Sequence, residues 1–528
     1  CRLEHIFNQN KAIIDLKNVK HVIIKNVMIK NTSEMLISVQ NSLKLKIINT
    51  SYLMNNIKFL SNYIQIKNRH FIKAVHLKTI VIRHSYFNKI YGSVISLKEV
   101  LTVEMQDTKF SNCRSLYGVL FVTFNDIEQS FHLLVHNSTF VSCKSGNSGG
   151  VVNIMNNNRK LELGRTDFSK KNWIALKEIE KERQKNVHIS VELYVINCNF
   201  LRCFSSINGG AINLELNPII FDNSKKFQNV QSKFVMINSA FKANRVTKNG
   251  GCLSLSGCHH VYISSSIFVQ CSAELGGALY INNRHNTGIL FSNGGNNNIN
   301  NVKLLECQIL NNLASVAGAG VYAAHIDMMM NIGLYITNNT SNNITNSISG
   351  GGIYIWKSGN VYNINCTYIR NSAYLGGGLN VCKCKNVTYL IHCTFKANKA
   401  FYGGGFFVEK TKNVYNIYSA YMMNLALIHG GGVYMIDTVT IIHMTCKYHQ
   451  NVNIGPEKSY GGGLYIQKSE HVSKINCTFA RNICKATALY HFPRNKADKK
   501  GGGAFIQNVT TTVILNCKYI KNVAFSKG

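Results

Sequence analysis

Residues 376–402 read GGGLNVCKCKNVTYLIHCTFKANKAFY, and the same pattern begins again at Gly403 with GGGFFV. The pattern is a glycine triplet, an alternating apolar run, Asn-Val, a second alternating run that ends in Cys, and then aromatic-x-x-Asn. Triplets or their remnants begin at residues 350, 376, 403, 430, 461 and 501, so the undisturbed repeat is 26 or 27 residues long. A fixed period of this length is typical of stacked supersecondary units that share one continuous core.

The alternation inside each repeat predicts strands and not helices. Ile364, Cys366 and Tyr368 alternate with Asn365 and Thr367, which is the period of two that a strand requires. A unit of three short strands without a helix can wind as one turn of a coil, in which each strand pairs in parallel with its equivalent one turn further on. We therefore predict an all-β fold, a right-handed parallel β-helix (a solenoid) of about 16 rungs with corner insertions.

The same pattern suggests how the chain is divided. Residues 1–528 are expected to form a single β-helix, with degenerate rungs over 1–90 and glycine-triplet rungs over 91–528. An insertion at about 169–186 is predicted to be an exposed helix, because Glu178 and Glu182, and likewise Lys181 and Lys185, are spaced four positions apart as on one face of a helix. Both ends fall inside the pattern, so we expect a piece of a longer protein. The Asn-Val pairs are expected to mark a corner at which stacked Asn side chains form a ladder.

The charge balance leaves two interpretations open. The chain carries 58 Lys+Arg against 24 Asp+Glu, a net charge of +34. Such an excess indicates either binding to a polyanion or the coding bias of an AT-rich genome, with Lys scattered along the chain. The sequence contains no motif that reads nucleic acid, so we do not expect nucleic acid as a partner. It also contains no long uncharged apolar stretch, so no membrane span is expected in this segment.

The cysteines fall into two repeating slots. Those of the first slot share the parity of buried residues and are expected to form an inward row of unpaired thiols: Cys198, Cys307, Cys366, Cys393, Cys446, Cys477 and Cys517. Those of the second slot replace the Asn of aromatic-x-x-Asn. Cys113 and Cys143 belong to this second slot and lie on consecutive rungs near a corner, which makes them a candidate disulfide. The spacing of Cys252, Cys258, His259 and His260 fits no familiar zinc site, so no metal or cofactor is predicted.

A catalytic interpretation requires paired carboxylates. Many β-helices bind or cleave acidic polysaccharides, and glycoside hydrolysis needs two carboxylates about 5–9.5 Å apart. The outward slot of the triplet strand holds acids only at Glu215 and Glu409, which lie six rungs apart. No catalytic residue is therefore predicted.

The residues of another outward slot of the triplet strand, two positions before that of Glu215 and Glu409, are mostly aromatic. They are expected to form a stripe along the coil, interrupted at Asn380, which is either a stacking ladder or a contact face for a partner chain or glycan. The stripe consists of Tyr280, Tyr322, Tyr354, Phe407, Tyr434, Tyr465 and Phe505. Asn365 and Asn476 lie in N-x-Ser/Thr sequons at outward positions and are the candidate glycosylation sites.

The alternation of GGxI-type and FxxN-type motifs resembles the repeats of the polymorphic outer membrane proteins of chlamydiae, and similar repeats occur in protist surface proteins. Phe395–Asn398 before Gly403 and Phe241–Asn244 before Gly250 are good matches, and the resemblance extends over about residues 85–528. The Cys row and the basic charge depart from that family. The resemblance implies a surface-exposed β-helix used for adhesion or assembly, with no catalytic residues to carry over.

Together these features predict a non-catalytic structural or adhesive protein, extracellular or on a cell surface. We expect a rigid rod that associates with itself or with another protein, laterally or end to end, with glycans as further candidate partners. The alternative is a β-helix that binds or cleaves polysaccharide, in the manner of pectate lyases.

Overall fold

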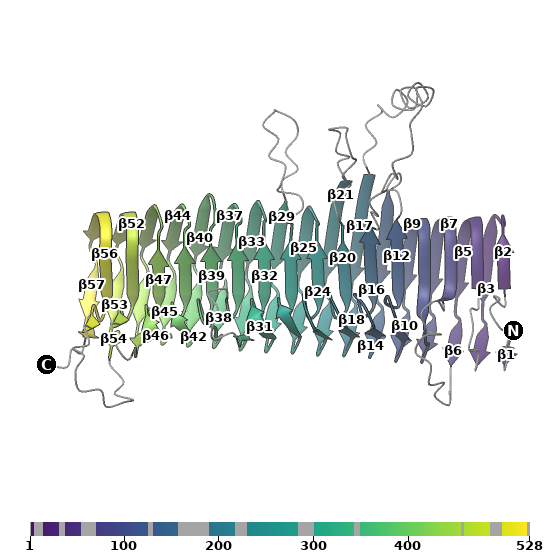
Figure 1. Ribbon diagram of the computed structural model, residues 1–528, viewed down its shortest axis with the longest axis horizontal. Helices are drawn as coiled ribbons and strands as arrows, with labels where there is room; N and C mark the ends of the chain where they lie inside the picture. Colours follow the sequence, from purple (N-terminus) through teal and green to yellow (C-terminus); the bar gives the residue numbers. More distant parts are fainter. Residues whose placement is uncertain are drawn as a thin grey trace, which may run out of the picture.

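The described residues form a parallel β-helix whose coils stack along one axis, with the N-terminus and the C-terminus at opposite ends (Figure 1). The computed structural model describes residues 2–4, 14–30, 37–53, 70–124, 130–156, 189–216, 230–283, 300–342, 349–455, 459–485 and 499–524. Equivalent strands of successive coils pair in parallel, as Tyr362 pairs with Tyr389 and Tyr368 pairs with Phe395. The predicted β-helix is therefore confirmed. The predicted helix at 169–186 lies outside the described residues.

The strands that follow the glycine turns, here called triplet strands, form the first row of each coil. Successive side chains of these strands point to opposite faces, so that every second side chain lies inside the coil. They are β12 (Leu120–Phe124), β16 (Val152–Asn156), β20 (Ile212–Glu215), β24 (Leu253–Ser256), β28 (Leu279–Asn282), β32 (Val321–Ala324), β36 (Ile353–Trp356), β39 (Leu379–Cys382), β43 (Phe406–Glu409) and β47 (Val433–Ile436).

The middle strands come next in each coil and carry the second alternating run. They are β13 (Phe131–His136), β17 (Ile189–Ile196), β21 (Val230–Ile237), β25 (His260–Ser264), β29 (Asn301–Leu305), β33 (Met328–Ile332), β37 (Asn360–Ile364), β40 (Val387–Ile391), β44 (Asn413–Ile417) and β48 (Thr440–Met444). Toward both ends of the rod, single long strands take the place of a triplet strand and a middle strand and join the two rows. These long strands are β5 (Ile37–Ile48), β7 (His70–Arg83), β9 (Ser93–Gln106), β52 (Leu464–Ile475) and β56 (Ala504–Leu515).

The anchor strands hold the aromatic of aromatic-x-x-Asn and form a sheet of 17 strands. At about 4.8 Å per coil, these strands extend over a rod about 77 Å long. They are β1 (Arg2–Glu4), β4 (Met28–Lys30), β6 (Ser51–Leu53), β8 (Tyr86–Asn88), β10 (Lys109–Ser111), β14 (Thr139–Val141), β18 (Asn199–Leu201), β22 (Ala240–Lys242), β26 (Ile267–Val269), β30 (Gln308–Leu310), β34 (Tyr335–Thr337), β38 (Thr367–Ile369), β41 (Thr394–Lys396), β45 (Ala420–Met422), β49 (Lys447–His449), β53 (Thr478–Ala480) and β57 (Lys518–Ile520).

The sharp corners of the coil are made by residues in the left-handed region. In one coil these are Gly376, Lys383 (φ 58°), His392 (φ 52°) and Ala397 (φ 55°). A left-handed non-glycine residue costs about 1–2 kcal/mol, so each corner depends on the flanking parallel ladders to hold it. At the middle glycine of a triplet even alanine has no room, because a Cβ at Gly431 would stand 2.2 Å from the backbone oxygen of Gly462.

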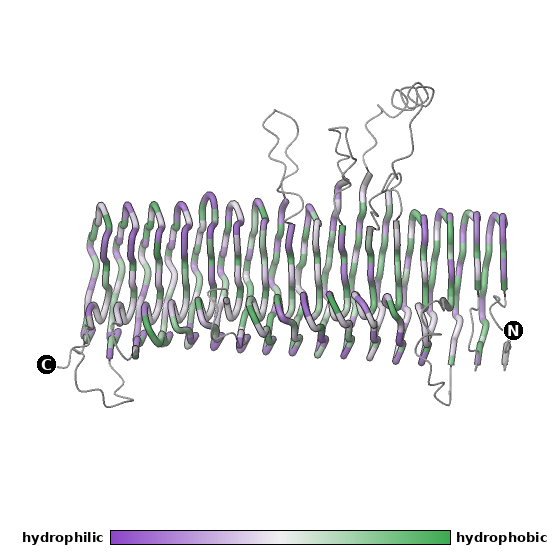
Figure 2. The backbone as a smooth tube through the Cα atoms, viewed as in Figure 1, coloured by the Kyte–Doolittle hydropathy of each residue, from purple (hydrophilic) through white to green (hydrophobic). Residues whose placement is uncertain are grey.

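The core lies inside the coil and consists of stacked columns of equivalent side chains. Apolar and polar residues accordingly alternate along the chain trace (Figure 2). The anchor aromatics stack ring on ring along the axis, with centroids 4.5 Å apart for Phe200–Phe241 and 4.6 Å for Tyr368–Phe395. The expected anchor at Met28 is shifted by one residue, because Ile29 pairs with Tyr52 and is buried whereas Met28 is exposed.

The ladder of Asn side chains occupies a different position from the one expected. The Asn of aromatic-x-x-Asn, and not that of Asn-Val, is buried and bonded from coil to coil. Asn424 Nδ2 donates to Asn451 Oδ1 over 2.9 Å, and Asn451 Nδ2 donates to Asn482 Oδ1 over 3.0 Å. Each of these side chains also donates to a backbone carbonyl, as Asn451 does to Tyr421 O over 2.8 Å. The turn after the anchor strand exposes backbone groups toward the interior, and the amide of Asn both donates to a backbone carbonyl and accepts from a backbone N–H there.

Candidate interaction surfaces

The predicted aromatic stripe does not stand in solvent. Tyr280, Tyr322, Tyr354, Phe407, Tyr434 and Tyr465 are all buried, and Phe505 is half-buried. The rings do stack along the axis, with centroids 5.1 Å apart for Tyr280–Tyr322 and 4.8 Å for Tyr434–Tyr465. Of the two interpretations of the stripe, the stacking ladder therefore describes the structure, and the interpretation as an exposed contact face is wrong.

The cover over the stripe comes from the residues just before each glycine triplet. Tyr402, His429 and Tyr460 occupy equivalent positions of successive coils and lie over the ladder. The His429 ring lies 5.0 Å from that of Tyr465, and the Tyr460 ring lies 4.7 Å from that of Phe505. Burial accordingly lowers the pKa of His429 to about 4. Parity along a single strand shows which residues leave the coil interior, but not whether a neighbouring corner folds over them.

The row of seven cysteines is confirmed as an inward row of unpaired thiols. Six of them are buried, Cys517 is half-buried, and none is bonded to another cysteine. Their thiols donate to backbone carbonyls, as Cys393 Sγ does to Asn363 O over 3.2 Å. Other coils place Ser in the same slot, and Ser419 Oγ accepts from the backbone N–H of Cys393 over 3.2 Å. The slot therefore needs a small side chain that hydrogen-bonds to the backbone of a corner. At Cys198, burial raises the pKa of the thiol to about 11 and keeps it protonated.

The candidate disulfide Cys113–Cys143 is wrong. Both thiols are buried and unbonded, and each donates to a backbone carbonyl two residues earlier. The disulfide joins Cys252 to Cys271 inside one coil, with Cα atoms 6.1 Å apart. Cys271 belongs to the second cysteine slot, and Cys252 replaces the third glycine of a triplet. In other coils this third glycine and the Asn of the ladder approach closely, as Gly432 and Asn451 do. The sequence analysis compared cysteines at equivalent positions of successive coils. It therefore missed a pair that lies within one coil, on opposite sides of it.

The two candidate glycosylation sites are accessible. Asn365 and Asn476 are exposed and occupy the left-handed corner between a middle strand and an anchor strand, with φ of 53° and 52°. Their outward position agrees with their parity. Whether they carry glycans stays a prediction.

A basic corner lies between the triplet strands and the middle strands of three consecutive coils. It is formed by the exposed residues Lys357, Lys383, Lys385, Lys410 and Lys412. Lys383, Lys385, Lys410 and Lys412 line one hollow together with Asp437. Glu409 lies 3.0 Å from Lys410 Nζ and raises the pKa of that lysine. The corner therefore keeps a net positive charge, although the lysines are scattered along the sequence.

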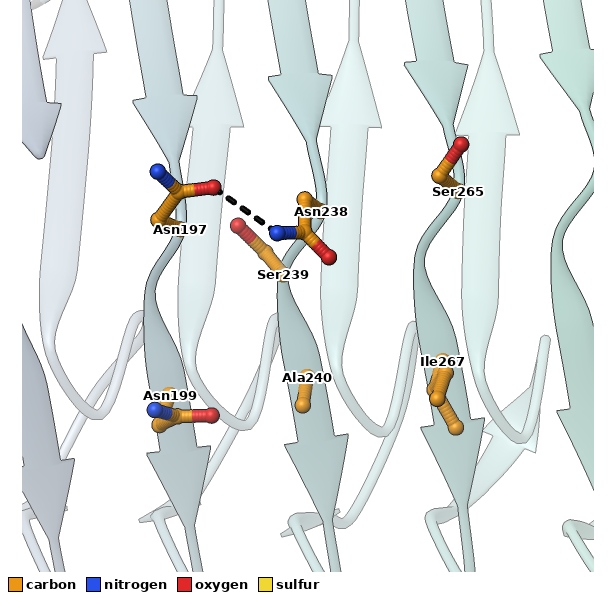
Figure 3. Close-up of a pocket in the computed structure, with 7 residues that line it drawn as sticks. All are labelled: Asn197, Asn199, Asn238, Ser239, Ala240, Ser265 and Ile267. Atoms are coloured by element: carbon orange, nitrogen blue, oxygen red, sulfur yellow. Dashed lines mark hydrogen bonds between the residues drawn. The ribbon is translucent and has the colours of Figure 1, made fainter. Parts of the chain in front are cut away.

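A second hollow lies where β17, β21 and β25 turn toward the anchor strands (Figure 3). Asn238 Nδ2 donates to Asn197 Oδ1 over 2.9 Å at its upper edge, and Ala240 and Ser265 leave space because their side chains are small. Its lining carries no charged group. The hollow is therefore a depression between neighbouring corner residues, and we assign no binding or catalytic function to it.

Acidic and metal-binding residues do not gather within the part of the chain that the structure describes. Glu215 and Glu409, the two outward acids of the triplet strands, belong to separate strands β20 and β43. Across the described ranges there is no group of three or more His, Cys, Asp and Glu side chains that could hold a metal ion. No helix among the same residues is long and apolar enough to cross a membrane.

The outward side of the middle strands is the surface that sequence reasoning missed. Tyr362, Tyr389 and Tyr415 are cross-strand neighbours and half-exposed, and their rings stack with centroids 5.3 and 5.0 Å apart. Beside them runs a column of aliphatic residues that are also half-exposed: Ile332, Ile364, Ile391, Ile417 and Met444. The sequence does contain a signal for this surface. In the second alternating run, the outward-facing positions hold apolar residues as well as the inward-facing ones.

Comparison with known proteins gave no match. No family model, no curated protein and no solved structure matches the chain. The fold therefore stands on the coordinates and the sequence pattern alone.

Proposed function

We propose that the protein is a non-catalytic structural or adhesive rod, extracellular or on a cell surface. The observation that carries this proposal is the continuity of the coil interior. The aromatic column and the Asn ladder connect coil to coil, so that Asn312, Asn339, Asn371, Asn398, Asn424, Asn451, Asn482 and Asn522 form one chain of hydrogen bonds. Because every coil is bonded to the next, the rod should be stiff, and it should hold the exposed residues of its corners at fixed distances from one another.

The likeness of the repeats to those of chlamydial polymorphic outer membrane proteins and of protist surface proteins supports the same proposal. The exposure of the sequons at Asn365 and Asn476 is compatible with a secreted chain. The test has two parts. Antibodies against the chain should label intact source cells, and negative-stain images of the purified protein should show rods at least about 77 Å long. An exclusively intracellular signal, or particles without an elongated shape, would refute the proposal.

The basic corner favours a second candidate function, the binding of an acidic polysaccharide. Lys383 and Lys385 face Lys410 and Lys412 across one coil spacing of about 4.8 Å, a separation that suits the closely spaced charges of a carboxylated or sulfated polymer. The probes are polygalacturonate and dextran sulfate. Binding should weaken about tenfold in Lys383→Gln/Lys412→Gln and with rising salt, because the contacts are ionic.

The matched control for this second function is Lys396→Gln/Lys399→Gln. It removes two exposed lysines of the same coil from a different side of the rod. Equal weakening in both double variants would show that the polymer binds non-specifically, through the net charge of +34, and would refute a site at the basic corner.

A further inference from the structure

The outward side of five middle strands forms an uncharged face, here called the apolar face. It consists of three columns on β33, β37, β40, β44 and β48. The central column is Met330, Tyr362, Tyr389, Tyr415 and Ile442, the column beside it is Ile332, Ile364, Ile391, Ile417 and Met444, and the third is Met328, Asn360, Val387, Asn413 and Thr440. No charged residue interrupts these columns, although the chain carries a net charge of +34.

The apolar face is large enough to hold a partner. The face ends at β29, where the charged Lys303 pairs with Met330 of the central column. With β52 added at the other end, six strands at about 4.8 Å span about 29 Å along the axis, and five residues at about 3.3 Å span about 16 Å across it. Two such faces pressed together bury about 930 Å², an area that suits a weak and transient complex. A patch of about 460 Å² is as large as the largest apolar patches of soluble monomers, which are often functional.

We propose that the apolar face binds the same face of a second copy of this chain, as a weak and reversible dimer. The proposal rests on the proposed function of an associating rod and names the surface that associates. An isologous contact is self-complementary by symmetry, and neither copy has to bury a charge to make it.

The rims of the apolar face select how the two copies are oriented. Lys385 and Lys412 border one side, whereas Asn365, His392 and Tyr418 border the other. With the two rods antiparallel and the two-fold axis along the strands, the basic rims would meet and repel. With the two-fold axis along the rods, each basic rim faces the other copy's rim of Asn365, His392 and Tyr418. We therefore expect parallel rods.

The test is sedimentation equilibrium of the full chain with two matched variants. Tyr389→Lys places a charge in the centre of the apolar face, and Thr394→Lys places the same charge at an outward position of β41. Dimerisation should be measurable below about 100 μM and should strengthen with salt, which screens the net positive charge. We expect Tyr389→Lys to raise the dissociation constant at least about tenfold and Thr394→Lys to leave it within about twofold.

Orientation is tested by oxidative cross-linking of cysteine variants. Parallel rods should cross-link a copy with Lys412→Cys to a copy with Tyr418→Cys, and should not cross-link two copies with Lys412→Cys. A chain that stays monomeric, or a dimer that tolerates Tyr389→Lys, would overturn the interface. A monomer strongly destabilised by Tyr389→Lys would mean that another segment of the chain covers the face, and would overturn it too. None of these results bears on surface labelling or rod length, so the proposed function is judged separately.

Discussion

Two regions of the same coil fill their cores in different ways. In residues 71–310, the apolar core region, the anchors are mainly Phe, and the inward residue five positions before each anchor is apolar, as Met236 is before Phe241. In residues 328–484, the polar core region, several anchors are Tyr, and the residue five positions earlier is polar except at Leu390 before Phe395. Tyr368 Oη donates to Asn363 Oδ1 over 2.9 Å, and Asn416 Nδ2 donates to Tyr421 Oη over 2.9 Å.

The slot after the anchor changes between the same two regions. It holds mainly Cys in the apolar core region and Asn throughout the polar core region. The third triplet position changes with it, from Val119 and Val151 to Gly432 and Gly463, because a Cβ at Gly432 would stand 3.1 Å from Asn451 Cγ. The difference teaches that the corners and ladders of the backbone define the coil. The core can be apolar or polar, provided that the equivalent side chains stacked in each column are compatible in size and hydrogen bonding.

The largest effect is expected from breaking the ladder of the polar core region. Asn451→Ala removes the acceptor of the Asn424 backbone N–H and the donor to Tyr421 O. Leaving such buried groups unpaired should lower the free energy of unfolding by about 3–5 kcal/mol. Cys203→Ala, in the same slot of the apolar core region, should cost about 1–2 kcal/mol because it removes only a small buried side chain. Chemical denaturation measures both, and equal losses would refute the distinction between the regions.

The polar core region should also be the acid-sensitive one. Burial lowers the pKa of His443 to about 3, and its Nδ1 lies within hydrogen-bond distance of Tyr448 Oη (2.7 Å) and Asn416 Nδ2 (2.9 Å). The unfolded chain takes up this proton below about pH 6.5 while the folded chain does not, so stability is full above that pH and falls below it. Between pH 7 and pH 5 the loss should be about 2 kcal/mol.

The matched variant for this pH effect is His443→Asn, which repeats the pairing of Asn363 with Tyr368 three coils further along the same column. It should lose about 2 kcal/mol less than the native chain over the same pH interval, because its side chain does not titrate there. Parallel pH profiles of unfolding for the two chains would contradict the assignment to His443. The half-buried His259 and His429, both with pKa lowered to about 4, keep some acid sensitivity in the variant.

A smaller effect sharpens the comparison at the anchors. Tyr421→Phe removes one hydroxyl while Asn416 keeps its bond to His443, so we expect a loss of about 1 kcal/mol. Phe241→Tyr should also destabilise the chain, because Met236 offers the new hydroxyl no partner. Adding Met236→Asn to Phe241→Tyr should recover part of that loss in a double-mutant cycle. Independent, additive costs would show that the Tyr–Asn pairing does not matter.

The period, the strands and the inward cysteine row could be predicted from the sequence because each depends on spacing along one chain. The burial of Tyr434 could not, because it depends on how far Tyr402 and His429 fold back from a neighbouring corner. The Cys252–Cys271 disulfide was missed for a related reason: its two slots lie opposite each other across the coil. The apolar face was missed because outward parity was considered for the triplet strands and not for Tyr389 and its neighbours.

The hydrogen bonds between coils run parallel to the rod axis, and this has a mechanical consequence. A pulling force on the two ends acts on these bonds in the direction in which they break, and all the bonds of one coil junction share the load. Junctions in the polar core region add the side-chain bonds of Asn398, Asn424 and Asn451 to the backbone bonds. Under tension we therefore expect the rod to open first in the apolar core region, coil by coil, while the polar core region stays wound.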